Sequence, residues 1–548
     1  MPPPAPHRSL PVLPRREIEA LIADGHAIII LDSYVLKADA WRPFHPGGDK
    51  AILHMVGRDA TDEVNALHSP EARQRMNSYK IGRVEGRWVN FVPPIQGGKF
   101  RPRDVEVVDE GVEAESASSQ DPSPVFDPVD PSSELRQRKG GYSRSSSISS
   151  VALDEDSRMS HIDVWTREEI KLDKSMYPPL EPEVQDDIVR KYRELGQRIK
   201  DAGLYQCNYT DYLIECTRYT LLLASCLYFL NIGWYKTSAA FLGMFWHQLV
   251  FSAHDAGHMG ITHSFTLDTI IGIVIADYLG GLSLGWWKHN HNVHHIVTNS
   301  PDHDPDIQHM PFFAVSHRFL LSLRSTYYDK IMTYDAVARV TLRAQHYLYY
   351  PVLLFGRFNL YRLSWVYLLG GQAPKRGPAW WHRWFEITGH VFFWTWFGYG
   401  ILYRSLPDNS TRLTYLLISH MVTMPVHAQI TLSHFAMSTA DLGPSESFVQ
   451  KMLRTTMDIE CPPWLDFFHG GLQFQAVHHL FPRIPRHNLR RTQALVQEFC
   501  KEVGIPYALY GFVEGNGRVI GRLGDVARQA KILAECKRVS VEKGEVPL

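Results

Sequence analysis

The stretch Gly470–Pro482, GGLQFQAVHHLFP, contains the paired histidines His478 and His479, and Gln475 lies three residues before them. Side chains at positions i, i+3 and i+4 of a helix lie on one face, about one turn apart. We therefore expect these three side chains to point the same way from a short helix. The predicted fold is built around this stretch, because two earlier segments carry histidines at similar spacing.

The two earlier segments are HDAGH, with His254 and His258, and HNVHH, with His291, His294 and His295. Histidine occupies 27 of the 548 positions, so one H-x-x-x-H is expected by chance roughly once, whereas H-x-x-H-H is expected well under once. The first cluster alone is weak evidence for a site. Three clusters together favour one shared site over histidines that only stabilise the structure.

Seven imidazoles exceed what one metal ion normally takes from a protein, which predicts two metal ions in a shared cage. Imidazole binds iron, copper, nickel and zinc, so the ligand type leaves the metal open. His434, in the segment LSHF, is a further candidate ligand. For His427 and His469, a structural role and metal binding carry equal weight.

Composition limits the classes of function. The net charge of -1 gives no electrostatic basis for binding nucleic acid. Six scattered cysteines without a C-x-x-C pair favour a reducing, cytosolic environment. The amino terminus has no apolar core of a cleavable secretory signal.

Residues 10–95 predict a small soluble domain centred on the segment FHPGG. It contains His45, and His68 follows 23 positions later in a segment with helical periodicity. Two imidazoles on facing turns can hold a haem iron from both sides, which suits electron transfer. Taken alone, His-Pro-Gly-Gly could also be an ordinary turn. We expect His54, between the two histidines, on the surface.

Residues 96–165 are dominated by Ser, Asp, Glu and Pro, a composition that cannot bury enough apolar area to become ordered. As a flexible tether of this length, the segment would span about 45 Å, enough for one domain to reach another. Residues 166–205 form a charged connector that we expect to be helical.

Residues 206–500 predict a membrane domain with every histidine cluster on one side. The segment Thr269–Trp287 then has to be re-entrant, and Tyr347–Leu369 has to lie along the membrane surface. The alternative is a set of buried helices in a soluble protein, and the mean hydropathy of -0.21 favours it only because the polar first 200 residues dilute the average. The four expected spans are Tyr219–Trp234, Thr237–Phe251, Gly389–Tyr403 and Leu413–Phe435.

The predicted fold is therefore mainly α: a four-span helical membrane domain with a cytosolic cap of histidine clusters, preceded by a small α+β haem domain. Residues 501–548 follow as a cytosolic tail. A haem carrier tethered to a two-metal site suggests reductive activation of O₂ and removal of hydrogen from unactivated C–H bonds. A membrane-embedded site implies a long-chain lipid substrate. Two hydrogen abstractions would give a double bond, and oxygen rebound after the first would give a hydroxyl.

Two resemblances bear on this choice. Residues 10–95 resemble the cytochrome b5 haem domain, including the segment GRDAT before His68, and this resemblance implies the α+β fold of the haem domain. Residues 206–500 resemble membrane fatty-acid desaturases of the front-end type, whose third histidine box begins with Gln, as at Gln475. The segments WWKHNH at 286–291, GGLQFQ at 470–475 and HHLFPR at 478–483 carry this resemblance, which extends to fungal sphingolipid delta-8 desaturases.

The resemblance implies a haem b bound by His45 and His68, and a non-haem di-iron site that uses O₂. It implies electrons from NADH through a cytochrome b5 reductase, a ceramide substrate among the membrane lipids, and a multi-pass protein of the endoplasmic reticulum whose haem domain and histidine boxes face the cytosol. Two alternatives stay open: a front-end acyl desaturase of delta-5 or delta-6 type, and a non-catalytic membrane haem carrier. The implied di-iron site comprises His254, His258, His291, His294, His295, Gln475, His478 and His479.

Overall fold

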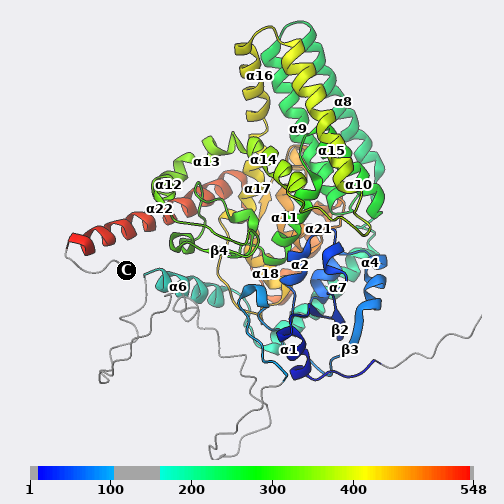
Figure 1. The fold of residues 1–548 in the computed structure, drawn as a ribbon, viewed down its shortest axis with the longest axis vertical. Coiled ribbons are helices and arrows are strands. Elements are labelled where there is room, and N and C mark those ends of the chain that lie inside the picture. Colours follow the sequence, from blue (N-terminus) through cyan, green and yellow to red (C-terminus); the bar gives the residue numbers. More distant parts are fainter. Residues whose placement is uncertain (1–9, 104–160, 543–548) are drawn as a thin grey trace, which may run out of the picture.

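The computed structural model describes residues 10–103 and 161–542 of the chain, and it is mostly helical. Most of the expected linker lies outside these residues. A small domain with the chain's first strands lies at the base, and a bundle of long helices projects away from it (Figure 1). Between them, shorter helices and loops form a cap.

The amino-terminal domain has a three-stranded antiparallel sheet in the order β1-β2-β3, with Ile29 opposite Leu36. Ile18, Val35 and Phe91 are buried in its core. A small α+β domain at this place was predicted. Its main elements are α1 (Arg15–Ala23), β1 (Ile28–Leu31), β2 (Tyr34–Lys37), α2 (Asp49–Leu53), α3 (Thr61–Leu67), α4 (Pro70–Met76) and β3 (Lys80–Arg83).

His54 is buried, with 1% of its surface exposed, so the prediction of a surface position was wrong. The Gln96 amide donates to His54 Nδ1 at 2.9 Å, and the His54 ring lies 5.3 Å from that of His303 in the helical domain. The prediction failed because it treated the amino-terminal domain as isolated, whereas the rest of the chain covers this face.

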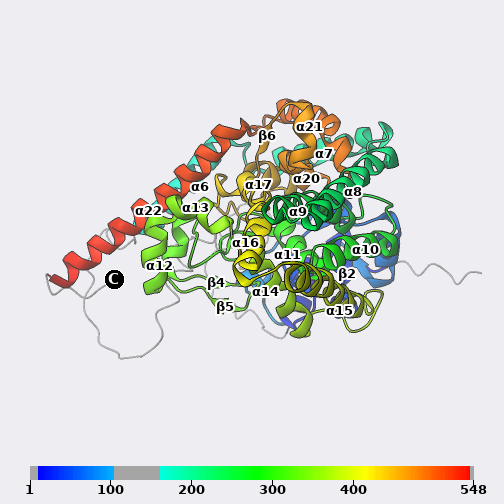
Figure 2. The same ribbon diagram turned by 90° about the horizontal axis from the view of Figure 1, so that it is seen from above.

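Four helical stretches form the projection, and α9 packs against both α8 and α16 (Figures 1 and 2). Trp246, Phe397 and Tyr415 are buried among them, so their contacts are largely apolar. The stretches are α8 (Tyr209–Asn231), α9 (Tyr235–Gly257), α15 (His382–Phe393) continued by the π-helix η9 (Trp394–Ser405), and α16 (Asn409–Met421).

Of the four expected crossings, only Tyr219–Trp234, which overlaps α8, matches a single described helix that is long and apolar enough to cross a membrane. The expected span Leu413–Phe435 is broken: α16 ends at Met421 and α17 (Met424–Phe435) begins after it. Pro425 lies in the first turn of α17, where its missing N–H costs nothing but prevents continuation of the preceding helix.

The chain turns sharply between α10 (Phe265–Ile273) with the π-helix η5 (Val274–Leu279) and α11 (Leu284–Val297). The bend is 116°, at a break of four residues. Gly281 lies in this break with φ +69°, and a Cβ there would overlap the Phe393 ring, so the turn needs glycine. The bend brings α11 back to the base of the projection.

The cap contains the remaining described helices and strands. Three of them connect the re-entrant turn to α15: α12 (Ala336–Thr341), α13 (Gln345–Leu353) and α14 (Gly356–Leu369). The later ones are α18 (Phe448–Thr455), β6 (Asp458–Glu460), α19 (Asp466–His469), α20 (Gln475–Leu480), α21 (Leu489–Val503), β7 (Leu509–Gly511) and α22 (Phe512–Glu542). Parallel pairing of β6 with β7 ties the end of the chain to the segment before α20.

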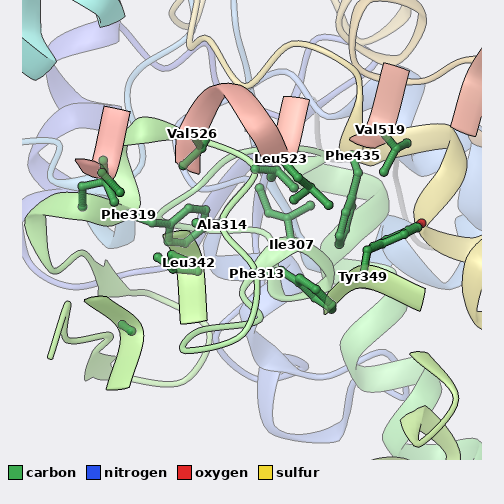
Figure 3. Close-up of a cluster of buried hydrophobic side chains, with 14 of the residues drawn as sticks. Ile307, Phe313, Ala314, Phe319, Leu342, Tyr349, Phe435, Val519, Leu523 and Val526 are labelled. Atoms are coloured by element: carbon green, nitrogen blue, oxygen red, sulfur yellow. The ribbon is translucent and has the colours of Figure 1, made fainter. Parts of the chain in front are cut away.

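The segment from residue 501 onward, expected as a tail, contributes to a hydrophobic core. Val519, Leu523 and Val526 on α22 pack with Phe435 and Tyr349 (Figure 3). The first half of α22 therefore stabilises the cap and the end of α17.

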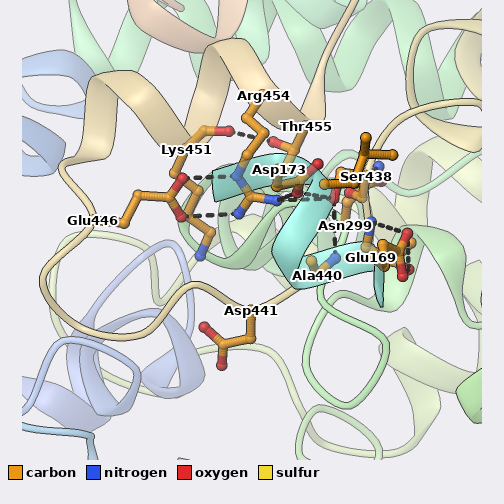
Figure 4. Close-up of polar contacts among 12 residues, drawn as sticks. Glu169, Asp173, Asn299, Ser438, Ala440, Asp441, Glu446, Lys451, Arg454 and Thr455 are labelled. Carbon is orange, nitrogen blue, oxygen red and sulfur yellow. Dashed lines mark hydrogen bonds and ion pairs between the residues drawn. The ribbon is translucent and has the colours of Figure 1, made fainter. Parts of the chain in front are cut away.

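The connector helices are α6 (His161–Met176) and α7 (Pro182–Asp201), and a buried ion network joins α18 to α6. Arg454 is 1% exposed; its Nε and Nη2 donate to the Glu446 carboxylate at 2.7 and 2.9 Å (Figure 4). Its Nη1 donates to Asp173 of α6 at 2.8 Å. One guanidinium thus compensates two buried carboxylates.

Removing this guanidinium should be costly. We expect Arg454→Ala to lower the free energy of unfolding by about 3–5 kcal/mol, because two carboxylates would stay buried without a counter-charge. Arg528→Ala is the control: Arg528 pairs with Asp525 on the exposed side of α22, and its loss should cost under about 1 kcal/mol. Equal losses in denaturant unfolding of the detergent-solubilised protein would contradict this assignment.

Candidate metal centre

Four helices bring the predicted histidines together at the base of the projection. His254 and His258 come from the end of α9, and His434 from the end of α17. α11 supplies the second cluster and α20 the third. Segments separated by as many as 224 positions, from His254 to His478, therefore meet at one place.

The turn before α20 fixes where its histidines point. Gly470 and Gly471 have φ of +58° and +94°, and a Cβ on Gly470 would overlap the Phe251 ring. At the start of α20, the Ala476 N–H donates to the Asp458 carboxylate at 2.7 Å. The glycine pair and this carboxylate hold α20 against α9.

The histidines form two adjacent groups, and within each group the potential ligand atoms lie within 4.8 Å of one another. In the first group, the ring centroids of His254 and His478 are 4.6 Å apart. In the second, those of His294 and His434 are also 4.6 Å apart. The first group comprises His254, His258, His291 and His478, and the second comprises His294, His434 and His479.

His295 lies between the two groups. Its ring centroid is 4.2 Å from that of His479 and 4.9 Å from those of His258 and His478. Its side chain is therefore placed to serve either group, or both.

Several imidazole nitrogens in these groups are buried without a hydrogen-bond partner among the described residues. A buried polar atom left unpaired costs about 1–3 kcal/mol, so an array of them calls for a ligand. Burial lowers the pKa of both His478 and His479 well below the usual range, which leaves neutral lone pairs for a metal ion. The unpaired atoms are Nε2 of His258, His478 and His479 and Nδ1 of His295 and His434. The donor set fits two metal ions with nitrogen ligands.

Carboxylates behind the histidines set the direction of the imidazoles. His294 Nδ1–H donates to Asp304 at 2.8 Å, and the Asn299 backbone N–H donates to the same oxygen at 2.7 Å. His291 Nδ1 lies 3.5 Å from Asp306. Such pairing fixes the tautomer and leaves Nε2 of each ring for a metal. Asp304 and Asp306 were not predicted as site residues, although the run DHDPD at 302–306 follows the second cluster closely enough to have indicated them.

The other candidates differ in position. Gln475 is 5% exposed and lines the same cavity as His478. His427 also lines that cavity, whereas His469 packs against Phe512 and the Gln429 amide. Neither His427 nor His469 belongs to a group of clustered ligands among the described residues.

A cavity of about 1310 Å³ opens from the histidines. Its far walls are mostly apolar and include Leu353, Leu360 and Leu363 from α13 and α14. Polar side chains also line it, among them Tyr327, Lys330 and Arg362 of the helical domain, together with Lys50 of the amino-terminal domain. Its size and lining suit a long apolar molecule with a polar end.

A second histidine pair lies in the amino-terminal domain. The ring centroids of His45 and His68 are 5.9 Å apart, close to the roughly 6 Å that two metal–nitrogen bonds of ~2 Å and two imidazole rings require. His45 Nδ1–H donates to the Gly48 carbonyl at 2.8 Å, which leaves Nε2 free. Burial and the neighbouring His45 lower the pKa of His68 to about 3. Both imidazoles are suited to bind haem iron.

The loop around His45 rests on α11. A Cβ at Gly48 would lie 2.6 Å from His289 Nε2, and one at Gly47 would overlap the Asn292 amide. Ala51 packs with Val293 and Val297. α11 thus contacts the loop of His45. It also carries His291 and His294 of the two histidine groups and His295, which lies between them.

The comparisons with known proteins agree with this arrangement. The fatty acid desaturase family matches residues 233–511, and the cytochrome b5-like heme/steroid binding domain matches residues 14–85. A protein of Emericella nidulans named delta 8-(E)-sphingolipid desaturase is 64% identical over 98% of this chain and 99% of its own. A protein of the same name from Candida albicans is 46% identical over 96% of this chain and 97% of its own.

The chain belongs to the fatty acid desaturase family and carries a fused cytochrome b5-like domain. It is therefore an oxidoreductase, and the resemblances expected from its sequence are confirmed. A sunflower protein, the delta(8)-fatty-acid desaturase of Helianthus annuus, is 37% identical over 63% of this chain and 75% of its own.

Asp304 offers a test of the second group. We expect Asp304→Asn to weaken metal retention about 10- to 100-fold, because an amide neither holds the His294 tautomer as firmly nor raises its basicity. The matched control is Asp302→Asn, since Asp302 pairs with Arg318 and not with a histidine. Metal content would be measured after graded chelation, and equal loss from both variants would contradict the role of Asp304.

Proposed function

We propose that this protein is a delta-8 sphingolipid desaturase that introduces an (E) double bond into the long-chain base of ceramide. The observation that carries the proposal is 64% identity, over nearly the whole of both chains, to a relative with that name. The matched length includes both domains, so the relative shares the amino-terminal domain as well as the desaturase domain.

The proposed site residues are those of the two histidine groups. Two iron ions held there would supply the O₂ chemistry that removes hydrogen from unactivated C–H bonds. Asp304 and Asp306 orient the imidazoles, and Gln475 lines the cavity beside His478. The proposed ligands are His254, His258, His291, His294, His295, His434, His478 and His479.

The cavity would hold the substrate beside these ligands. Its apolar walls would exclude water from the reacting carbons and hold the hydrocarbon chain of the long-chain base by contact along α13 and α14. The position of the double bond along the lipid chain would then be set by the distance from the histidines to the place where the polar headgroup binds. The polar side chains that line the cavity are placed to contact such a headgroup.

We propose His45 and His68 as the axial ligands of haem b, which would deliver electrons. Because the loop of His45 contacts α11, only about one helix diameter, roughly 10 Å, separates it from the histidines on the other side of that helix. An NADH-dependent cytochrome b5 reductase is the proposed electron source.

We further propose four membrane spans: α8, α9, α15 with η9, and α16 with α17. α9 has 23 residues, about 35 Å of helix, which matches the bilayer core. The histidines at the ends of α9 and α17, and the haem domain below them, would face the cytosol from the endoplasmic reticulum. The proposed units are residues 10–95 (haem domain), 96–165 (linker), 166–205 (connector), 206–500 (desaturase domain) and 501–548 (tail).

Lipid analysis tests the reaction. Expressed in yeast that lacks the activity, the protein should convert ceramide long-chain bases to products with an (E) bond at carbon 8, located by mass spectrometry. A delta-5 or delta-6 bond in fatty acyl chains instead would replace this proposal with the acyl desaturase. A chain that forms neither product while its haem is reduced normally would be an electron carrier.

Two histidine variants separate the two centres. His478→Ala should abolish the product but leave the haem spectrum intact, because His478 faces the histidines of α9 and α11 and not the haem ligands. His45→Ala should remove the bis-histidine spectrum and also stop turnover. Product formation by either variant at wild-type rate would contradict the assignment of its site.

A further inference from the structure

Two cations of the desaturase domain, Lys288 and Arg483, lie near the proposed haem ligands, and within the described residues neither has a carboxylate at ion-pair distance, although Asp268 acts on both from farther away. Lys288 belongs to the segment WWKHNH and is 8% exposed. Within the described residues, no carboxylate lies in ion-pair distance of its ammonium group, whose nearest aromatic contact is the Phe265 ring at 5.6 Å.

Lys288 is adjacent to His289, the residue whose ring packs against Gly48 in the loop of His45. Burial is the largest cause of the lowered pKa of His45, and the charge of Lys288 adds to it. The ammonium group is thus close enough to act electrostatically on one proposed axial ligand.

Arg483 is in a similar position beside the other proposed ligand. It is also 8% exposed, and its Nη1 donates to the backbone carbonyl of His68 at 3.0 Å. Its Nε is buried without a partner, and no described carboxylate forms an ion pair with it. Arg483 follows the third histidine cluster by four residues, so it connects His68 to α20.

A buried cation without an anion is costly, and a carboxylate is the ligand that a guanidinium or an ammonium group prefers. Haem b has two propionate carboxylates, and it would be held between His45 and His68. We propose that Lys288 and Arg483 bind the haem propionates, so that the desaturase domain completes the haem site and holds the haem edge against α11. This rests on the proposed axial ligation by His45 and His68.

The two cations would give the fused haem a binding site that the amino-terminal domain alone does not have. They would also fix the orientation of the haem relative to the histidine groups. Each cation lies close in sequence to a histidine of these groups: Lys288 precedes His291 by three residues, and Arg483 follows His479 by four. The amino-terminal domain would then bind the desaturase domain through the haem propionates as well as through its protein surface.

The rate of haem loss from the full-length holoprotein to apomyoglobin tests the proposal. The double variant Lys288→Gln/Arg483→Gln should lose haem about 10- to 100-fold faster than wild type, because two charge-assisted contacts are removed. Charge-preserving Lys288→Arg/Arg483→Lys should stay within about threefold of wild type. Arg193→Gln is the matched control: it removes the 2.8 Å contact between the connector helix α7 and Asp62 of the amino-terminal domain, and it should change the rate less than about twofold.

Haem dimethyl ester separates propionate binding from a general loosening of the domains. In wild-type protein loaded with the ester, loss should already be about 10-fold faster than with haem, and the double glutamine variant should add under twofold. Equal loss of haem and ester from wild type, or an unchanged effect of the variant on the ester, would overturn the proposal. Absence of a bis-histidine spectrum in wild type would instead reject the axial ligation on which it rests.

Discussion

Buried imidazole nitrogens without hydrogen-bond partners are the constraint on which this structure depends. At least five such atoms converge where α9, α11, α17 and α20 meet. Burying a neutral imidazole costs less than burying a charged imidazolium, but a buried imidazole nitrogen without a partner still destabilises the fold. Metal ions bound by the proposed ligands would satisfy these nitrogens, and the glycine turn at 470–471, the Asp458 carboxylate and the 116° bend before α11 bring them together.

The helix α11 connects the two functions of the chain. One side contacts Gly47, Gly48 and Ala51 of the amino-terminal domain, and other positions contribute His291 and His294 to the two histidine groups, with His295 between them. Because both sets of contacts depend on one rigid element, the distance between the haem site and the histidines is fixed by helix geometry and not by the tether. The linker then needs only to keep the domains associated.

The sequence predicted the local features well. Helical spacing of i, i+3 and i+4 was enough to expect that each cluster faces one way, and the segment FHPGG with the resemblance to cytochrome b5 was enough to expect a separate α+β domain. His434 joined the second group as expected from the segment LSHF. These features depend on short-range periodicity, which single-sequence patterns record directly.

What the sequence did not predict depends on contacts between distant segments. His54 is buried because the helical domain covers it, and α22 contributes to a core with α13 and α17. Pro425 divides the apolar run Leu413–Phe435 into two helices, whereas its hydropathy predicted one continuous span. In the sequence, nothing distinguishes Asp304, Lys288 and Arg483 from other charged residues. Their roles follow only from the groups that the fold places beside them.

Iron stoichiometry tests the central claim most directly. Purified wild-type protein should contain two non-haem iron ions for each haem, with the non-haem iron in a nitrogen-rich environment by Mössbauer and X-ray absorption spectroscopy. Haem iron alone, in protein that still turns over substrate, would contradict the account, because the converging histidines would then have no ligand to justify their burial.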